Sequence, residues 1–242
     1  MHGLVEQRRT NRSDGPTTAA TPWRRGGWAV GSALALVAWG GALVGGYAWL
    51  VDHATRPGAA GAAPARWPTS VPSLAGPDEA ALLVFLHGEC PCSPATVREL
   101  GRALATATDA GASSPRVVAL FAPVGRPETS ATWTALDLLP GVERRTDDGG
   151  RLAATFGART SGHVVLYGAD GALRFAGGVT AARGHLGPNA GADALAAALA
   201  ATRPAAAAGA AVFGCPLTEA AAERPDAPTL AATCAPARGA AW

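Results

Sequence analysis

Two cysteines separated by a single proline are the residues of this chain best placed to do chemistry. Cys90 and Cys92 follow an apolar run and precede Ser93-Pro94, which are expected to cap and open a helix. The unpaired N–H groups and the dipole of a helix N-terminus favour a thiolate over a thiol. Glu89 opposes this effect by like-charge repulsion, and a protonated His87 offsets Glu89. The residues alone leave open whether Cys90 or Cys92 is the nucleophile.

The spacing of the two cysteines permits a disulfide between them. Cα atoms two residues apart lie about 5.5–7 Å from each other, which overlaps the range of about 4.4–6.8 Å found in disulfides. Such a bond would be strained, and strained disulfides are the more easily reduced ones. The alternatives to a redox pair are a Cu(I) or Zn site that also uses a histidine, and inert thiols.

A third cysteine, Cys215, stands in the sequence Phe-Gly-Cys-Pro-Leu near the C-terminus. It could resolve a mixed disulfide formed at Cys90 or Cys92. It could instead pair with Cys234, which would close a loop of about 20 residues and stabilise the fold by roughly 3 kcal/mol in the chain-entropy model. The residues by themselves leave both pairings open.

The elements around the cysteine pair are those of an α/β domain. Apolar runs at residues 82–86 and 116–121 predict buried parallel strands joined by a helix over residues 94–110. Residues 163–167 and 172–175 flank an Asp-Gly turn and predict a β-hairpin. Further elements are expected as a helix over 127–139, a strand over 142–145, a helical turn over 152–156 and a helix over 189–201.

An uncharged stretch, residues 26–51, predicts one transmembrane helix. As a helix it would extend ~39 Å, more than the roughly 30 Å hydrocarbon core of a bilayer. Five arginines lie within residues 1–25, which places the N-terminus in the cytoplasm and the rest of the chain in the periplasm of a bacterial inner membrane. A cleaved signal peptide and a buried core helix are the alternatives.

The chain therefore divides into five expected parts. These are a cytoplasmic tail (1–25), the transmembrane helix (26–51), a flexible linker rich in Pro, Ala and Gly (52–74), the α/β domain (75–203), and an Ala/Pro-rich tail (204–242) with an ordered island at 213–217. The net charge is +2 and only 16% of residues are charged, with scattered arginines, so no nucleic-acid surface is expected.

The order of these elements, with a cysteine pair after the first strand, resembles the thioredoxin fold. Within that fold, the sequence resembles the RedB-like group of membrane-anchored, periplasm-facing proteins. The motifs that carry the resemblance are residues 87–93, 156–163, 177–185 with Asn189, and 213–217. The resemblance implies a thiol–disulfide oxidoreductase without a cofactor that exchanges with a protein dithiol or disulfide through Cys90, Cys92 and Cys215. Copper chaperones of the Sco type are the alternative, with copper bound by two cysteines and a histidine.

Two features depart from the usual thioredoxin pattern. The cysteines are one residue closer than in C-x-x-C, and Ser161-Gly162 occupies the place of the expected cis-proline. The resemblance places Ser161, Gly162 and His163 beside the thiols, where they would bind substrate together with His87. His185 either reaches an anionic or peroxidic substrate or a metal, or only packs its loop. A peroxidase is a third hypothesis, but the expected Thr-x-x-Cys loop is absent.

Overall fold

A computed structural model describes residues 23–201 and 206–218 of the 242-residue chain, which form two separate units. Helix α1 (Trp23–Thr55) supplies the described part of the first unit, which ends at Leu50, and its last residues belong to the second unit. The large apolar side chains of α1 between Trp28 and Val51 are exposed on all sides. The part from Trp28 to Thr55 has a mean hydropathy of 1.7 and is long and apolar enough to cross a membrane. Most of the expected cytoplasmic tail lies outside the described residues.

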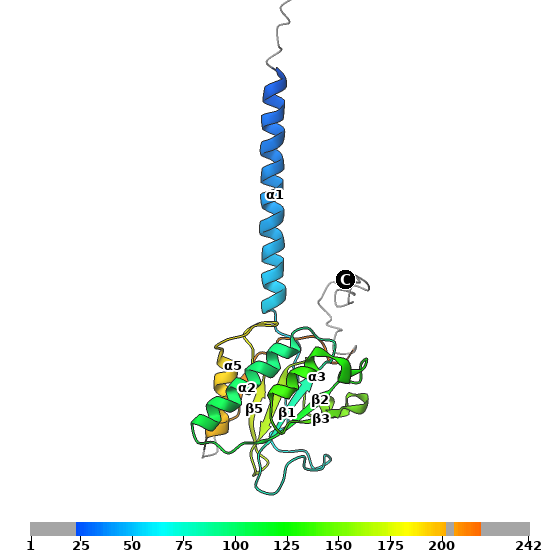
Figure 1. The fold of residues 1–242 in the computed structure, drawn as a ribbon, viewed down its shortest axis with the longest axis vertical. Coiled ribbons are helices and arrows are strands. Elements are labelled where there is room, and N and C mark those ends of the chain that lie inside the picture. The colour runs from blue at the N-terminus through cyan, green and yellow to red at the C-terminus, as the bar shows by residue number, and fades with distance from the viewer. Residues whose placement is uncertain (1–22, 202–205, 219–242) are drawn as a thin grey trace, which may run out of the picture. The chain divides into compact units, whose positions relative to one another are not determined.

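The second unit is built on one six-stranded sheet in the order β3-β2-β1-β4-β5-β6 (Figure 1). Strands β1, β2 and β3 are parallel, β4 runs antiparallel to both β1 and β5, and β6 is parallel to β5. The strands are β1 (Ala81–Leu86), β2 (Arg116–Phe121), β3 (Glu143–Thr146), β4 (His163–Tyr167), β5 (Leu173–Gly177) and β6 (Ala208–Ala210). The central order β2-β1-β4-β5, with a parallel crossover and then a hairpin, is that of the thioredoxin fold and confirms the expected class.

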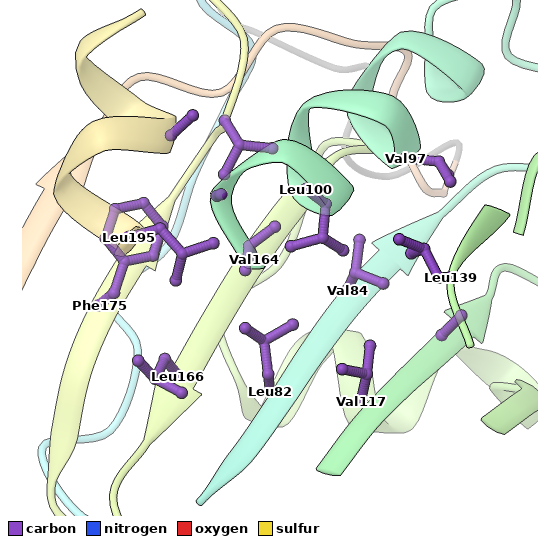
Figure 2. Close-up of a cluster of buried hydrophobic side chains, with 14 of the residues drawn as sticks. Leu82, Val84, Val97, Leu100, Val117, Leu139, Val164, Leu166, Phe175 and Leu195 are labelled. Carbon is purple, nitrogen blue, oxygen red and sulfur yellow. The ribbon is translucent and has the colours of Figure 1, made fainter. Parts of the chain in front are cut away.

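Helices cover one face of the sheet. They are α2 (Ser93–Asp109), α5 (Ala190–Ala200) and the short α3 (Ala131–Ala135), and they lie together in front of the strands in Figure 1. Figure 2 shows Leu100 of α2 and Leu195 of α5 above the strand residues Val84, Val164 and Phe175. All five side chains are fully buried, so this layer is the main hydrophobic core and holds the start of α2 against the sheet.

A second, smaller core lies on the opposite face, where Phe85, Phe156 and Leu217 are buried. Short helix α4 (Arg151–Thr155) borders this core. Trp67 packs against it, with its ring centroid 5.1 Å from that of Phe156 and 5.3 Å from that of Tyr167. Trp67 also donates its backbone N–H to the Gly171 carbonyl oxygen at 2.8 Å.

The stretch 58–74 therefore differs from the flexible tether expected over residues 52–74. Besides Trp67, Leu173 donates its N–H to the Ala65 carbonyl oxygen at 2.9 Å, and Tyr167 donates its hydroxyl to the Pro64 carbonyl oxygen at 2.8 Å. Residues 52–55 belong to α1. The Pro, Ala and Gly content indicated flexibility, but backbone hydrogen bonds and the half-buried Trp67 attach the segment to the domain.

Two other elements also differ from expectation. The single helix expected over 127–139 is divided into η1 (Pro127–Thr129), α3 and η2 (Leu136–Leu138). Ser130 separates η1 from α3, because it is extended and caps α3, accepting a hydrogen bond from the Trp133 N–H at 3.1 Å. The tail expected from residue 204 contributes strand β6 to the sheet edge, and residues 219–242 of that tail lie outside the described residues.

Candidate active site

The cysteine pair lies at the junction between β1 and α2, as the sequence predicts. The loop after β1 turns so that the Cys90 N–H donates to the His87 carbonyl oxygen at 3.1 Å, and the Ser93 N–H donates to the Cys90 carbonyl oxygen at 3.2 Å. Helix α2 begins at Ser93, so its N-cap is Cys92 and not the expected Ser93. Pro94 occupies the first turn, where its missing N–H leaves no intrahelical bond unmade.

Three cysteine side chains meet at this junction. Cys90 is buried, with 2% of its surface exposed, whereas Cys92 and Cys215 are half-buried. Hydrogen bonds from the side chains of Cys215 and Cys92 hold the pKa of Cys90 far below its usual range, and a bond from Ser93 adds to this. Burial raises the same pKa but is outweighed. These hydrogen bonds favour the thiolate form of Cys90, which has Cys92 and Cys215 as neighbours.

The segment that carries Cys215 is bound to the domain through its backbone. The Ser161 N–H donates to the Cys215 carbonyl oxygen at 2.8 Å, and the Leu217 N–H donates to the Arg159 carbonyl oxygen at 2.9 Å. Gly214 is required at its position, because a Cβ there would stand 2.1 Å from the Ser161 carbonyl oxygen. Together with the burial of Leu217, these contacts place the Cys215 sulfur beside Cys90.

Arg183 fixes the same segment from another side. Its guanidinium donates to the Gly214 carbonyl oxygen and, through Nε, to the His53 carbonyl oxygen at 3.1 Å. Its backbone N–H donates to the Ala54 carbonyl oxygen at 2.9 Å. The arginine of the Arg-Gly-His motif thus serves to anchor the chain next to Cys215.

Two serines form a buried pair beneath the thiols. The Oγ atoms of Ser93 and Ser161 lie 2.7 Å apart, and both residues are 1% exposed. Ser161 Oγ also accepts the His87 N–H at 2.8 Å. The described residues contain no cis peptide bond, and Gly162 has a φ of +91°, a conformation that glycine adopts without strain. Ser161 and Gly162 therefore occupy the place of the expected cis-proline with a different geometry.

The three histidines proposed as substrate-binding residues have different environments. His87 lies in the thiol loop, where its Nδ1 accepts the Glu89 N–H at 3.2 Å. His163 is 2% exposed, neither ring nitrogen has a hydrogen-bond partner, and burial lowers its pKa to about 4. Since β-strand side chains alternate, His163 lies on the same sheet face as Val165, away from α2. His185 is exposed in the loop before α5.

A buried carboxylate that the sequence reasoning missed holds this last loop to α2. Glu99 is 4% exposed and accepts hydrogen bonds from Arg102 at 2.6 Å, the Gly187 N–H at 2.7 Å and Asn189 Nδ2 at 3.1 Å. Asn189 also caps α5, accepting the Ala192 N–H at 2.8 Å. Asn189 thus has a structural role. The sequence signal that could have identified Glu99 is a glutamate on the apolar face of the helix expected over residues 94–110.

Copper binding would require the cysteine sulfurs, with or without a histidine, to be grouped around one position where a metal ion fits. Cys90, Cys92 and Cys215 are soft donors of the kind that select Cu(I). Within residues 23–201 and 206–218, however, no group of three or more His, Cys, Asp or Glu side chains is arranged to hold a metal ion. The donor types fit copper and their described arrangement does not.

Comparison with known proteins finds distant likenesses in structure only. No protein-family model matches the chain, and no curated protein matches it. A hypothetical protein from Sinorhizobium meliloti is 18% identical, with a TM-score of 0.42 over 58% of this chain and 80% of that chain. A secreted Mycobacterium tuberculosis disulfide oxidoreductase homologous to E. coli DsbE is 17% identical, with a TM-score of 0.35 over 51% and 81%. Bradyrhizobium japonicum ScoI with copper bound is 16% identical, with a TM-score of 0.31 over 50% and 83%. The fold assignment rests on the strand order, and the function must be argued from the thiols.

Proposed function

We propose that this protein is a thiol–disulfide oxidoreductase held at a membrane by α1, with its thioredoxin-like domain outside the cytoplasm. The observation that carries the proposal is that Cys90, in the loop just before α2, accepts hydrogen bonds from two other cysteine side chains, Cys215 and Cys92. A thiolate with a neighbouring thiol on each side can close a disulfide with either of them. A pair of inert core cysteines would need no such arrangement.

Burial suggests the order in which the sulfurs act. Cys90 is too enclosed to meet a protein partner, whereas Cys92 at the N-cap of α2 is half-buried. Cys92 loses its proton to solvent and attacks the partner disulfide, which releases one partner thiolate. That thiolate takes up a proton from solvent, and Cys90 stays a thiolate. The Cys90 thiolate then attacks Cys92 sulfur, expels the second partner thiolate and leaves a Cys90–Cys92 bond.

Cys215 forms the final disulfide of the reaction. Its thiol, once deprotonated by the expelled partner thiolate, attacks Cys90 and frees Cys92 as a thiolate. The result is a Cys90–Cys215 disulfide, with two electrons transferred in total to the partner. This bond is preferred over Cys90–Cys92 because a bond between residues two apart is strained. Reversal of the same steps would oxidise a partner dithiol.

The membrane helix supports the proposed location. Because α1 is apolar and exposed on all sides, a bilayer is the environment that suits it. The arginines that precede it favour a cytoplasmic N-terminus, and disulfide chemistry suits the periplasmic side of a bacterial inner membrane. A protein dithiol or disulfide is the proposed partner. The four motifs that resemble RedB-like proteins fit the same function and include all three sulfurs.

The test uses the full chain in detergent micelles and the reduction of insulin disulfides by dithiothreitol. The wild type should accelerate the reaction, and Cys90→Ser should abolish the acceleration while retaining insulin in a mixed disulfide at Cys92, detected by mass spectrometry. Cys234→Ser is the matched control and should keep the full rate. An unchanged rate in Cys90→Ser would contradict the proposal.

Copper is the competing hypothesis, and the same preparation tests it. The reduced chain is incubated with Cu(I) and passed through a desalting column before its copper content is measured. Retention of one copper per chain by the wild type, lost in Cys90→Ser, together with no insulin reduction, would assign the thiols to metal binding. Loss of copper on the column with insulin reduction intact would support thiol–disulfide exchange.

A further inference from the structure

We infer that Ser161 is a positioning residue for Cys90, which orients the Ser93 hydroxyl toward the Cys90 sulfur and holds Cys215 beside it. The inference rests on the proposed function and adds a residue to its machinery. Ser161 side-chain and backbone atoms contact all three parts of the site, namely the loop after β1, the first residue of α2 and the Cys215 segment. A residue that only filled space would need none of these polar contacts.

The hydrogen atoms of the two hydroxyls can be assigned by counting donors and acceptors. Ser161 Oγ already accepts the His87 N–H at 2.8 Å and lies 2.7 Å from Ser93 Oγ. A hydroxyl has one hydrogen to donate. If Ser161 donates to Ser93, the Ser93 hydrogen is left for the His87 carbonyl oxygen, which is 3.4 Å away, or for Cys90, whose pKa a hydrogen bond with Ser93 lowers. A charged sulfur is the stronger acceptor, so the order Ser161 to Ser93 to Cys90 prevails when Cys90 is a thiolate.

The backbone of Ser161 makes the arrangement rigid. Its N–H donates to the Cys215 carbonyl oxygen at 2.8 Å, and the next residue, Gly162, donates to the Phe85 carbonyl oxygen at 2.7 Å. Because Ser161 is almost fully buried, water is not available to replace its hydroxyl. Removing that hydroxyl leaves the His87 N–H without its acceptor and Ser93 free to rotate away from the sulfur.

The experiment measures the pH dependence of Cys90 alkylation in the reduced full chain. Iodoacetamide pulses at a series of pH values are followed by mass spectrometry of the Cys90 peptide, so no turnover is needed. Ser93→Ala should raise the midpoint by about 1 pH unit, the size expected for a hydrogen bond to a charged group. Ser161→Ala should raise it by a smaller amount. The double variant should match Ser93→Ala alone, because Ser161 acts through Ser93.

Two further comparisons separate positioning from folding. Ser73→Ala, which removes an exposed hydroxyl bonded only to Ala75, is the control and should leave the midpoint unchanged. Ser161→Thr and Ser161→Val have the same shape, so only Thr should retain the wild-type midpoint. This pair decides the question if Ser161→Ala does not fold. The ionisable groups of the site that stay the same in every variant are Cys92, Cys215, His87, Glu89 and Arg183.

Additive effects of Ser93→Ala and Ser161→Ala, or equal midpoints for Thr and Val at position 161, would overturn the inference. Because the readout is alkylation, the inference can fail while insulin reduction persists. Conversely, a shifted midpoint in a chain that reduces no insulin would leave the positioning role intact and refute only the oxidoreductase. The two failures are thus distinguishable.

Discussion

Oxidation should stabilise this domain strongly, and the size of the effect identifies the pair of cysteines that bonds. A Cys90–Cys215 disulfide closes a loop of about 125 residues, which corresponds to about 5 kcal/mol of stabilisation in the chain-entropy model. A Cys90–Cys92 bond closes a loop of three residues and would contribute less than about 2 kcal/mol on the same model. The free energy of unfolding of the oxidised and reduced forms therefore reports the pairing.

The assay is thermal unfolding of the full chain, followed by near-UV circular dichroism, with and without dithiothreitol. For a domain of this size, about 5 kcal/mol corresponds to a Tm difference of roughly 10–20 °C. Cys92→Ser should keep the whole difference, because it leaves Cys90 and Cys215 intact. Cys215→Ser should lose most of it, and Cys234→Ser is the control that should behave as the wild type.

The refuting results are equally definite. If oxidised Cys92→Ser were no more stable than the reduced form, the resting bond would be Cys90–Cys92. If Cys90→Ser kept a gain of about 3 kcal/mol on oxidation, Cys215 would be paired with Cys234, which lies outside the described residues. Both outcomes would contradict the final step of the proposed mechanism.

Two further predictions concern buried ionisable groups. The pKa of His163 in the folded state, about 4, lies below its unfolded value of 6.5, so the unfolded chain takes up the proton first as the pH falls. The stability that neutral His163 contributes is complete above pH 6.5, and it falls by about 1.4 kcal/mol per pH unit down to about pH 4. The free energy of unfolding of His163→Leu, measured in urea, should lack this pH dependence. The same dependence in His163→Leu and the wild type would contradict the assignment to His163. Glu99→Gln should cost about 2–3 kcal/mol, because it removes the charge that pairs with Arg102 and turns one of the two acceptor oxygens into an NH₂ group that faces other donors. Urea unfolding checks this against Glu79→Gln, which alters an exposed hydrogen bond to the Gly76 N–H and should change stability by less than about 0.5 kcal/mol.

Local patterns predicted most of the α/β domain. The apolar run at 82–86 and the hairpin around Asp170-Gly171 became β1, β4 and β5, because strand formation there depends on side chains that are close in the sequence. The helix start near Cys92 was displaced by one residue. Ser93 was expected as the cap, but its hydroxyl is bonded to Ser161 instead, a contact 68 residues away along the chain.

Amino-acid composition predicted less well the segments whose order depends on contacts with other parts of the domain. Residues 58–74 are rich in Pro, Ala and Gly, yet backbone hydrogen bonds and the packing of Trp67 against Phe156 and Tyr167 attach the segment to the domain. Ala208–Ala210 carries no strand signal, yet it pairs with β5. In both cases the partner strand supplies the hydrogen bonds, and no property of the segment alone reveals it.

The sequence by itself determined the cysteine pair at a strand-to-helix junction, the apolar helix at the N-terminus and the class of the fold. These depend on periodicity, length and turn residues, which act over a few positions. Only the tertiary structure decided that Cys215 lies beside Cys90, that Ser93 pairs with Ser161 and that Arg183 anchors Gly214. Such contacts join segments that approach one another only when the sheet closes, so their geometry is a property of the packed domain.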